Sequence, residues 1–130
     1  MNILKLRDET ATGKINYEFE LIIDAEIITV KELITKRVTY EVEKYNSQKE
    51  EFFNGLVQPT ESEKSLNGYK MRHKKEINLN KQIEKALESF ESNGFFIIAN
   101  NRQLENLDEA IFLDKESNIS FIKLVHLVGG

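Results

Sequence analysis

The last fourteen residues, Ser117-Asn-Ile-Ser-Phe-Ile-Lys-Leu-Val-His-Leu-Val-Gly-Gly130, carry the pattern that decides the fold. Residues 119–128 are rich in β-branched, aromatic and leucine side chains, which suit a largely buried strand. Two glycines follow, and without Cβ atoms they form a sterically permissive tail on that strand. The glycine pair is a weak signal by itself, because glycine is a common residue. The rest of the chain decides whether the tail has a function.

The pattern leaves the register of this last strand open. Either Ile119 and Phe121, or Ile122 and Leu124, could face the core. A slip of one residue exchanges the two faces of a strand. The register therefore decides which of these side chains a partner could reach.

The composition is that of one ordinary globular domain, 1–130, with 40% hydrophobic and 31% charged residues. No apolar run approaches the ~18 residues of a membrane span, and residues 1–7 alternate like a strand instead of having the layout of a signal peptide. We therefore expect a cytoplasmic protein that does not enter membranes. Because the chain has no cysteine, disulfides, thiolate metal sites and a catalytic thiol are excluded. The net charge of −4 gives no reason to expect nucleic-acid binding.

The first third of the chain predicts a hairpin followed by a helix. Residues 3–6 form a short first strand, residues 8–14 a polar turn, and residues 15–23 a second strand with strict alternation. Thr29 and Glu32 have the spacing of a capping box at the start of a helix. The apolar residues that follow trace one helical stripe: Val30, Leu33, Ile34, Val38, Val42 and Tyr45.

Residues 46–94 are the least regular part and predict an insertion of about 50 residues with some helix of its own. A short helix is compatible with the spacing of four apolar residues, which either pack within the domain or dock a partner: Phe52, Phe53, Leu56 and Val57. Residues 60–65 are a polar run, and residues 70–75 are a basic cluster that we interpret as a solvated loop. Asn80 is the expected N-cap of a second helix, which ends at residues 92–94.

The remaining elements predict an α+β fold. Residues 95–99 read as a short apolar strand, 100–101 as a turn, and 103–104 as a brief edge strand. Residues 107–113 predict a turn or a 3₁₀ segment before the last strand. A mixed sheet with its helices on one face, and with the chain terminus projecting from a strand end, fits this order.

Residues 95–130 resemble the C-terminal half of ubiquitin and of the wider β-grasp modifier family. Gln103-Leu-Glu105 and Lys115-Glu-Ser117 match ubiquitin residue for residue, and the final strand ends in Gly-Gly as in that family. The resemblance implies a β-grasp fold, a mixed sheet wrapped on one helix, enlarged by the insertion at 46–94. His126 and Val128 replace the arginines of ubiquitin's tail, which makes the chain more similar to bacterial ubiquitin-like proteins.

The family resemblance also implies a function for the terminus. An E1-like enzyme would use ATP and Mg²⁺ to adenylate the Gly130 carboxylate, and Gly129 would fit the narrow approach to that enzyme's active site. Leu127, Val128 and His126 would contact the partner. An E2-like enzyme, a JAB-type metallopeptidase and the lysines of target proteins complete the expected partners, in systems sometimes linked to antiviral defence.

Further partner sites follow from the same resemblance. The apolar outer side of the sheet offers Ile98, Ile122 and Leu124, although burial of these residues is an equally good interpretation. Arg102 stands where ubiquitin has its best-known chain-linking lysine, whereas Lys115 falls on another chain-linking lysine and is also an ordinary turn lysine.

Two alternatives stay open beside the modifier. One is a sulfur carrier whose terminus becomes a thiocarboxylate, and the other is a β-grasp interaction domain whose glycines are incidental. An enzyme is not expected, because His73 and His126 have no nearby nucleophile arrangement and no glycine-rich phosphate loop exists. We expect no catalytic residue, no metal site and no bound cofactor in this chain.

Overall fold

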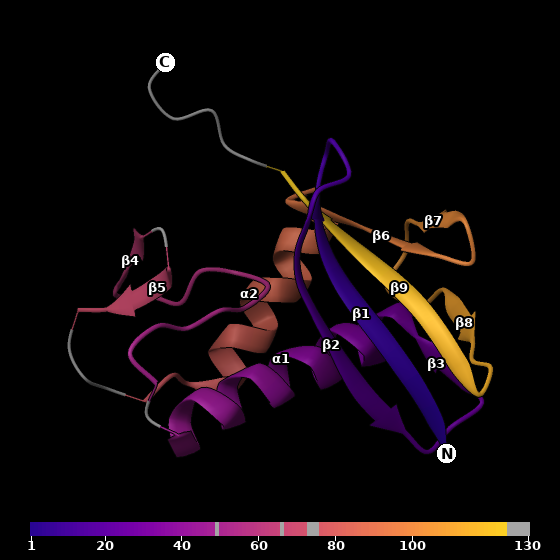
Figure 1. Ribbon diagram of the computed structural model, residues 1–130, viewed down its shortest axis with the longest axis horizontal. Helices are drawn as coiled ribbons and strands as arrows, with labels where there is room; N and C mark the ends of the chain where they lie inside the picture. The colour runs from indigo at the N-terminus through magenta and orange to yellow at the C-terminus, as the bar shows by residue number, and fades with distance from the viewer. Residues whose placement is uncertain (49, 66, 73–75, 125–130) are drawn as a thin grey trace. The chain divides into compact units, whose positions relative to one another are not determined.

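The computed structural model describes residues 1–48, 50–65, 67–72 and 76–124 (Figure 1). The chain forms two compact units, of which the first contains residues 1–31 and the chain from residue 90 onward, and the second contains residues 32–89. The architecture is α+β. The first unit is built on a mixed five-stranded sheet, and the second contains most of both helices.

The five strands of the main sheet stand in the order β2-β1-β9-β6-β7. They are β1 (Asn2–Thr10), β2 (Ile15–Ile23), β6 (Phe95–Ala99), β7 (Arg102–Leu104) and β9 (Glu116–Lys123). Strand β1 is antiparallel to β2 and parallel to β9, and β9 is antiparallel to β6. The first and last strands of the chain are therefore neighbours inside the sheet, which gives the backbone of each strand hydrogen-bond partners on both sides.

The first strand is longer than the sequence predicts. Strand β1 continues through Asp8 to Thr10, where we expected a polar turn to begin. Asp8 is buried because it lies on the same face as Leu4 and Leu6, and it pairs with both β2 and β9. The turn is confined to the residues after Thr10, where Gly13 has a φ of 91° and donates its N–H to the Thr10 carbonyl at 2.9 Å.

The register of β9 is settled by its two neighbours. Ile119 and Phe121 are fully buried on the face that β1 and β6 also bury, opposite Leu6 and Ile97 respectively. The Phe121 ring lies 6.1 Å from the Phe95 ring. Ile122 is half-buried on the opposite face, so the first of the two registers left open by the sequence is the observed one.

A short two-stranded sheet lies just before the first helix. It pairs β3 (Ile27–Thr29) with β8 (Ala110–Phe112) in antiparallel fashion. The sequence predicts neither strand, and it assigns residues 107–113 to a turn or 3₁₀ segment, which is wrong for the last part of that range. The N–H groups of Val30 and Lys31 donate to the carbonyls of Glu109 and Leu107, so the start of the helix is tied to this segment by backbone bonds.

Both predicted helices are present. Helix α1 (Val30–Gln48) is helical throughout, and its predicted apolar stripe is buried. Helix α2 (Leu79–Glu91) begins earlier than expected, because Asn78 and not Asn80 is the capping residue: its Oδ1 accepts the Lys81 N–H at 2.9 Å. At the other end, Asn93 takes the left-handed conformation with a φ of 63°.

Residues 50–72 differ most from the prediction. No helix forms over 50–58; Phe53 makes a single backbone bridge to Tyr69 instead. The polar run contributes β4 (Ser62–Ser65), which pairs with β5 (Gly68–Met71) in a hairpin where we expected a loop. The burial of Phe53, Leu56 and Val57 confirms the packing interpretation of these residues. A backbone bridge needs a partner elsewhere in the chain, and apolar spacing alone does not reveal one.

The predicted insertion, 46–94, falls mostly inside the second unit, which also contains most of α1. A single ubiquitin-like domain with this insertion stays a prediction.

Candidate functional site

The predicted reactive terminus lies outside the described residues. This applies to Gly129, Gly130 and the three partner-binding candidates before them, His126, Leu127 and Val128. The structure describes the chain up to Leu124, one residue after the end of β9. The candidate site is therefore built from the end of β9 and from the sheet around it.

The outer face of the sheet carries an apolar row next to the end of β9. Phe96 and Ile98 on β6 and Ile122 on β9 alternate with the fully buried residues of these strands, so they point to the opposite face. Phe96 is directly opposite Ile122, and Ile98 is opposite Ser120 on one side and Gln103 on the other. All three apolar side chains are half-buried. Ile98 and Ile122, the two of them predicted as partner contacts, are therefore only partly accessible to a partner.

Among the predicted partner-binding residues that the structure describes, Leu124 is the most accessible. Its side chain is 44% exposed, directly after the last residue of β9. An isolated exposed leucine is normal on a protein surface, so its exposure alone does not define a site. Together with Ile98 and Ile122, it extends the apolar row of the outer face to the last described residue, directly before residues 125–130 (the terminal segment).

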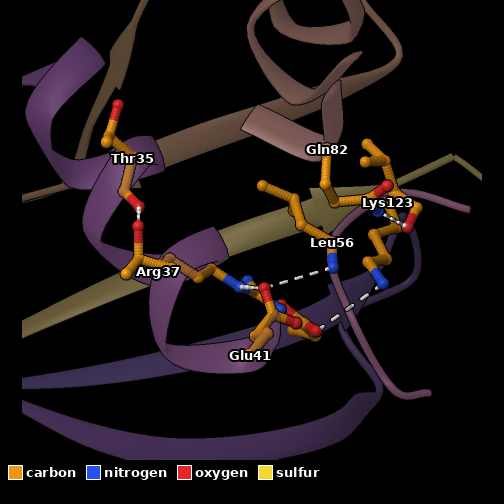
Figure 2. Close-up of polar contacts among 9 residues, drawn as sticks. Thr35, Arg37, Glu41, Leu56, Gln82 and Lys123 are labelled. Carbon is orange, nitrogen blue, oxygen red and sulfur yellow. Dashed lines mark hydrogen bonds and ion pairs between the residues drawn. The ribbon is translucent and has the colours of Figure 1, made fainter. Parts of the chain in front are cut away.

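The inner face at the same end of the sheet holds an ion pair that the sequence did not predict. The Lys123 ammonium lies 3.7 Å from the Asp8 carboxylate, which is only 7% exposed (Figure 2). Asp8 is opposite Phe121 in the parallel register, and Lys123 is two residues further along β9. The pair therefore links the last residues of β9 to β1. Its only signal in the sequence is an acidic residue that continues the alternation of the first strand.

Lys115 is exposed in the turn before β9. Its carbonyl accepts the Ile3 N–H at 3.0 Å, so the backbone is fixed while the side chain stays accessible. Exposure is what an acceptor lysine needs, and it is also what an ordinary turn lysine has. The chain-linking role of Lys115 stays a prediction.

The second unit contains a buried ion pair on α1. Arg37 is fully buried, and its Nε donates to Glu41 Oε1 at 3.0 Å, one helical turn away (Figure 2). The same carboxylate oxygen lies 3.4 Å from the Leu56 N–H. The sequence signal for this pair is the i, i+4 spacing of two charges that each precede a valine of the apolar stripe. The contacts tie residues 50–58 to the helix, which is a structural role.

The basic cluster at 70–75 is described only in part, since residues 73–75 lie outside the described chain. Lys70 and Arg72 are exposed and stand 4.0 Å and 3.8 Å from Glu51 and Glu63, respectively. Acidic neighbours compensate these two cations, so they form no uniformly basic surface.

The described ranges bear on two other kinds of site. They contain no group of three or more histidine, cysteine, aspartate or glutamate side chains placed to hold a metal ion. Neither α1 nor α2 is both long and apolar enough to cross a membrane.

Comparisons with protein-family models, with curated proteins and with solved structures found no match to this chain.

Proposed function

We propose that this chain is a ubiquitin-like protein modifier with a β-grasp fold. The Gly130 carboxylate is activated by ATP on an E1-like enzyme and then transferred to the amines of target proteins. The chain is a substrate of this machinery and contributes no catalytic residue. The observation that carries the proposal is a mixed sheet whose last strand leads, seven residues after Lys123, to Gly129-Gly130.

The sheet supports the proposal through its topology. An N-terminal hairpin, a helical segment and a final strand that returns parallel to β1 are compatible with a β-grasp fold. Parallel neighbours require a crossover connection, and the long segment between β2 and β9 supplies it. The burial of Ile119 and Phe121 and the pair between Asp8 and Lys123 fix β9 almost to the start of the terminal segment.

The chemistry requires the carboxylate of Gly130 to be free, either in the chain as given or after removal of a following segment. A free carboxylate is a poor electrophile, so an acyl adenylate must form first: the carboxylate oxygen attacks the α-phosphorus of ATP and pyrophosphate leaves. The absence of cysteine is consistent with the next step, because the thioester then forms on a thiol of the partner.

The outer face of the main sheet supplies a surface that a partner in such a system could recognise. Phe96, Ile98 and Ile122 are half-buried on one face, and Leu124 follows at its end. An E1-like or E2-like partner that covers these residues would hold the terminus in a fixed direction.

The test is incubation of the full chain with ATP, Mg²⁺ and its E1-like enzyme, followed by intact mass spectrometry. We expect pyrophosphate exchange and a thioester adduct on the enzyme, and both disappear when Gly130 is deleted. Gly129→Val blocks the same steps, since a side chain at this position obstructs a narrow channel. Lys64→Ala, on the exposed β4, serves as the control and leaves both signals unchanged.

Two outcomes would overturn the proposal. Exchange of oxygen for sulfur at the terminus, without transfer to amines, would assign the chain to the sulfur carriers. Absence of any adduct, with a cellular function that survives deletion of Gly130, would assign it to non-conjugated interaction domains.

A further inference from the structure

Four exposed apolar side chains of the first unit lie at the end of the sheet that is remote from Lys123, the last residue of β9. Ile22 and Phe112 are each 67% exposed, Ile27 is 54% exposed and Ile3 is 38% exposed. Ile3 is directly opposite Ile22 in the β1–β2 pair, and Ile27 is directly opposite Phe112 in the β3–β8 pair. We call these four residues the Ile27–Phe112 surface.

Three hydrogen bonds fix the two pairs at one end of the first unit. The Asn2 side chain donates to the Ala25 carbonyl at 2.6 Å, and the Ile3 N–H donates to the Lys115 carbonyl at 3.0 Å. The Leu113 N–H donates to the Glu26 carbonyl at 2.8 Å. In Figure 1, β3 and β8 lie beside the end of the sheet where the N-terminus is marked. The two pairs, on β1 and β2 and on β3 and β8, therefore lie at the same end of the first unit.

Exposed carboxylates surround these apolar side chains. Asp24 and Glu26 lie between Ile22 and Ile27 in the sequence, and Asp114 follows Phe112 by two residues. Glu116 is opposite Ile3 in the parallel register with β9. Lys115 is the one cation in the turn from Asp114 to Glu116. The surface thus combines an apolar centre with a predominantly acidic rim.

We propose that the Ile27–Phe112 surface is a docking site for a protein partner whose apolar contact residues are flanked by lysine and arginine. Charge complementarity selects this occupant, because opposite potentials across an interface favour both encounter and register. A second copy of the chain would place acidic rims against each other. The acidic rim would also repel partners that carry phosphates, namely nucleic acid and anionic membrane surfaces.

The size of the surface sets the strength of the contact. Four partly exposed side chains offer less than the ~800 Å² per partner of a standard stable interface, so this one is transient. Affinity depends mainly on Phe112, because aromatic residues dominate such contacts.

The surface and Lys123, the last residue of β9, lie at opposite ends of the β1–β9 pair. Eight consecutive residue pairs join β1 and β9 between Ile3↔Glu116 and Thr10↔Lys123, which corresponds to roughly 23 Å along the sheet. A partner bound at the Ile27–Phe112 surface would leave the Lys123 end of β9 uncovered. The inference therefore does not depend on conjugation of Gly130.

The test is an NMR titration of the full chain with a short synthetic amphipathic peptide of leucine and lysine, and with its counterpart carrying glutamate in place of lysine. We expect the lysine peptide to shift the amides of residues 22–28 and 110–116, and the shifts to weaken as salt is added. Phe112→Ser weakens binding by at least about tenfold, and Ile22→Ser by about threefold.

Ile15→Ser is the matched control, because Ile15 is a 47% exposed isoleucine at the opposite end of the same strand as Ile22. It changes the affinity by less than about twofold. Thermal unfolding of each variant checks that these exposed substitutions preserve the fold, as expected for surface positions.

Four results would overturn the inference. Equal binding of the glutamate peptide would remove charge complementarity as the basis of recognition. Shifts confined to other residues, or equal effects of Ile15→Ser and Ile22→Ser, would place binding elsewhere. Concentration-dependent dimerisation in sedimentation that Phe112→Ser abolishes would identify a second copy of the chain as the occupant.

Discussion

The main sheet and residues 50–72 differ in how their buried backbone groups obtain hydrogen-bond partners. In the sheet, backbone groups bond to neighbouring strands, and the buried face of β9 can be apolar, with Ile119 and Phe121 almost inaccessible to solvent. The described residues within 50–72 have one short hairpin and one isolated bridge, and side chains from the two helices satisfy part of their backbone. Strands that pair regularly satisfy each other's backbone N–H and C=O groups, so the core between them can be apolar. Irregular buried backbone lacks such partners and needs polar side chains to supply them.

The polar contacts of the second unit show this directly. Gln82 donates its side-chain amide to the Val57 carbonyl at 2.8 Å, and Glu41 lies 3.4 Å from the Leu56 N–H (Figure 2). Asn46 makes two bonds to the backbone of Ile77, at 2.9 Å and 3.0 Å. The sheet therefore depends on apolar volume, and the second unit depends also on specific polar partners.

The largest expected effect tests the apolar side of the comparison. Phe121→Ala should lower the free energy of unfolding by about 3–5 kcal/mol, because it opens a cavity among fully buried side chains. Ile122→Ala, on the half-buried opposite face, should cost only about 1 kcal/mol. Urea unfolding followed by circular dichroism measures both. Equal losses would contradict the register of β9.

The polar side of the comparison is tested by Arg37→Ala. This change leaves the Glu41 carboxylate buried without its guanidinium partner, and we expect a loss of about 3 kcal/mol in the same unfolding experiment. The double substitution Arg37→Met with Glu41→Leu should be less destabilising, because no charge then stays buried. Hydrogen exchange of the Leu56 amide should nevertheless be faster in the double variant, because its acceptor, Glu41 Oε1, is lost. A double variant as unstable as Arg37→Ala would show that packing, and not charge, is the main contribution.

A third prediction concerns Gly55, which has no room for a side chain. A Cβ atom at this position would lie 2.2 Å from a ring carbon of Phe53 and 2.9 Å from Glu41 Oε2. Because Phe53 is buried and its ring packs edge-on against Tyr45, Gly55→Ala should cost about 1–3 kcal/mol. In a Phe53→Leu background the cost should shrink. Strict additivity of the two changes would argue against this clash.

The smallest effect concerns pH. Burial raises the pKa of Tyr45 above its ordinary value of 10.0, and the charge of Glu50 raises it further. The folded state then retains the phenol proton more tightly than the unfolded state. The contribution of Tyr45 to the free energy of unfolding is therefore complete below pH 10 and is lost as pH rises through the folded pKa. Stability of the wild type should therefore decline more steeply above pH 10 than that of Tyr45→Phe. Parallel pH profiles of unfolding would contradict the prediction.

The elements that the sequence predicted well are those whose signal is local. The strands at 15–23 and 95–99 have the expected bounds, and the stripe on α1 is buried as expected. Alternation and helical spacing need only neighbours in the chain to be recognised. For the site, local pattern nominated Ile98, Ile122 and Leu124, and the structure places all three on or beside the outer face of the sheet.

The elements that only tertiary structure decided depend on partners far away in the sequence. Strands β3 and β8 are three residues each, and about 80 residues separate them, so neither has a periodic signal. The extension of β1 through Asp8, the register of β9 and the Arg37–Glu41 pair likewise depend on contacts that no short window contains. Gly129 and Gly130 were nominated by sequence alone, because a terminal motif is local. The strand β9 that precedes them, and the face on which Ile119 and Phe121 are buried, follow from pairing with β1 and β6.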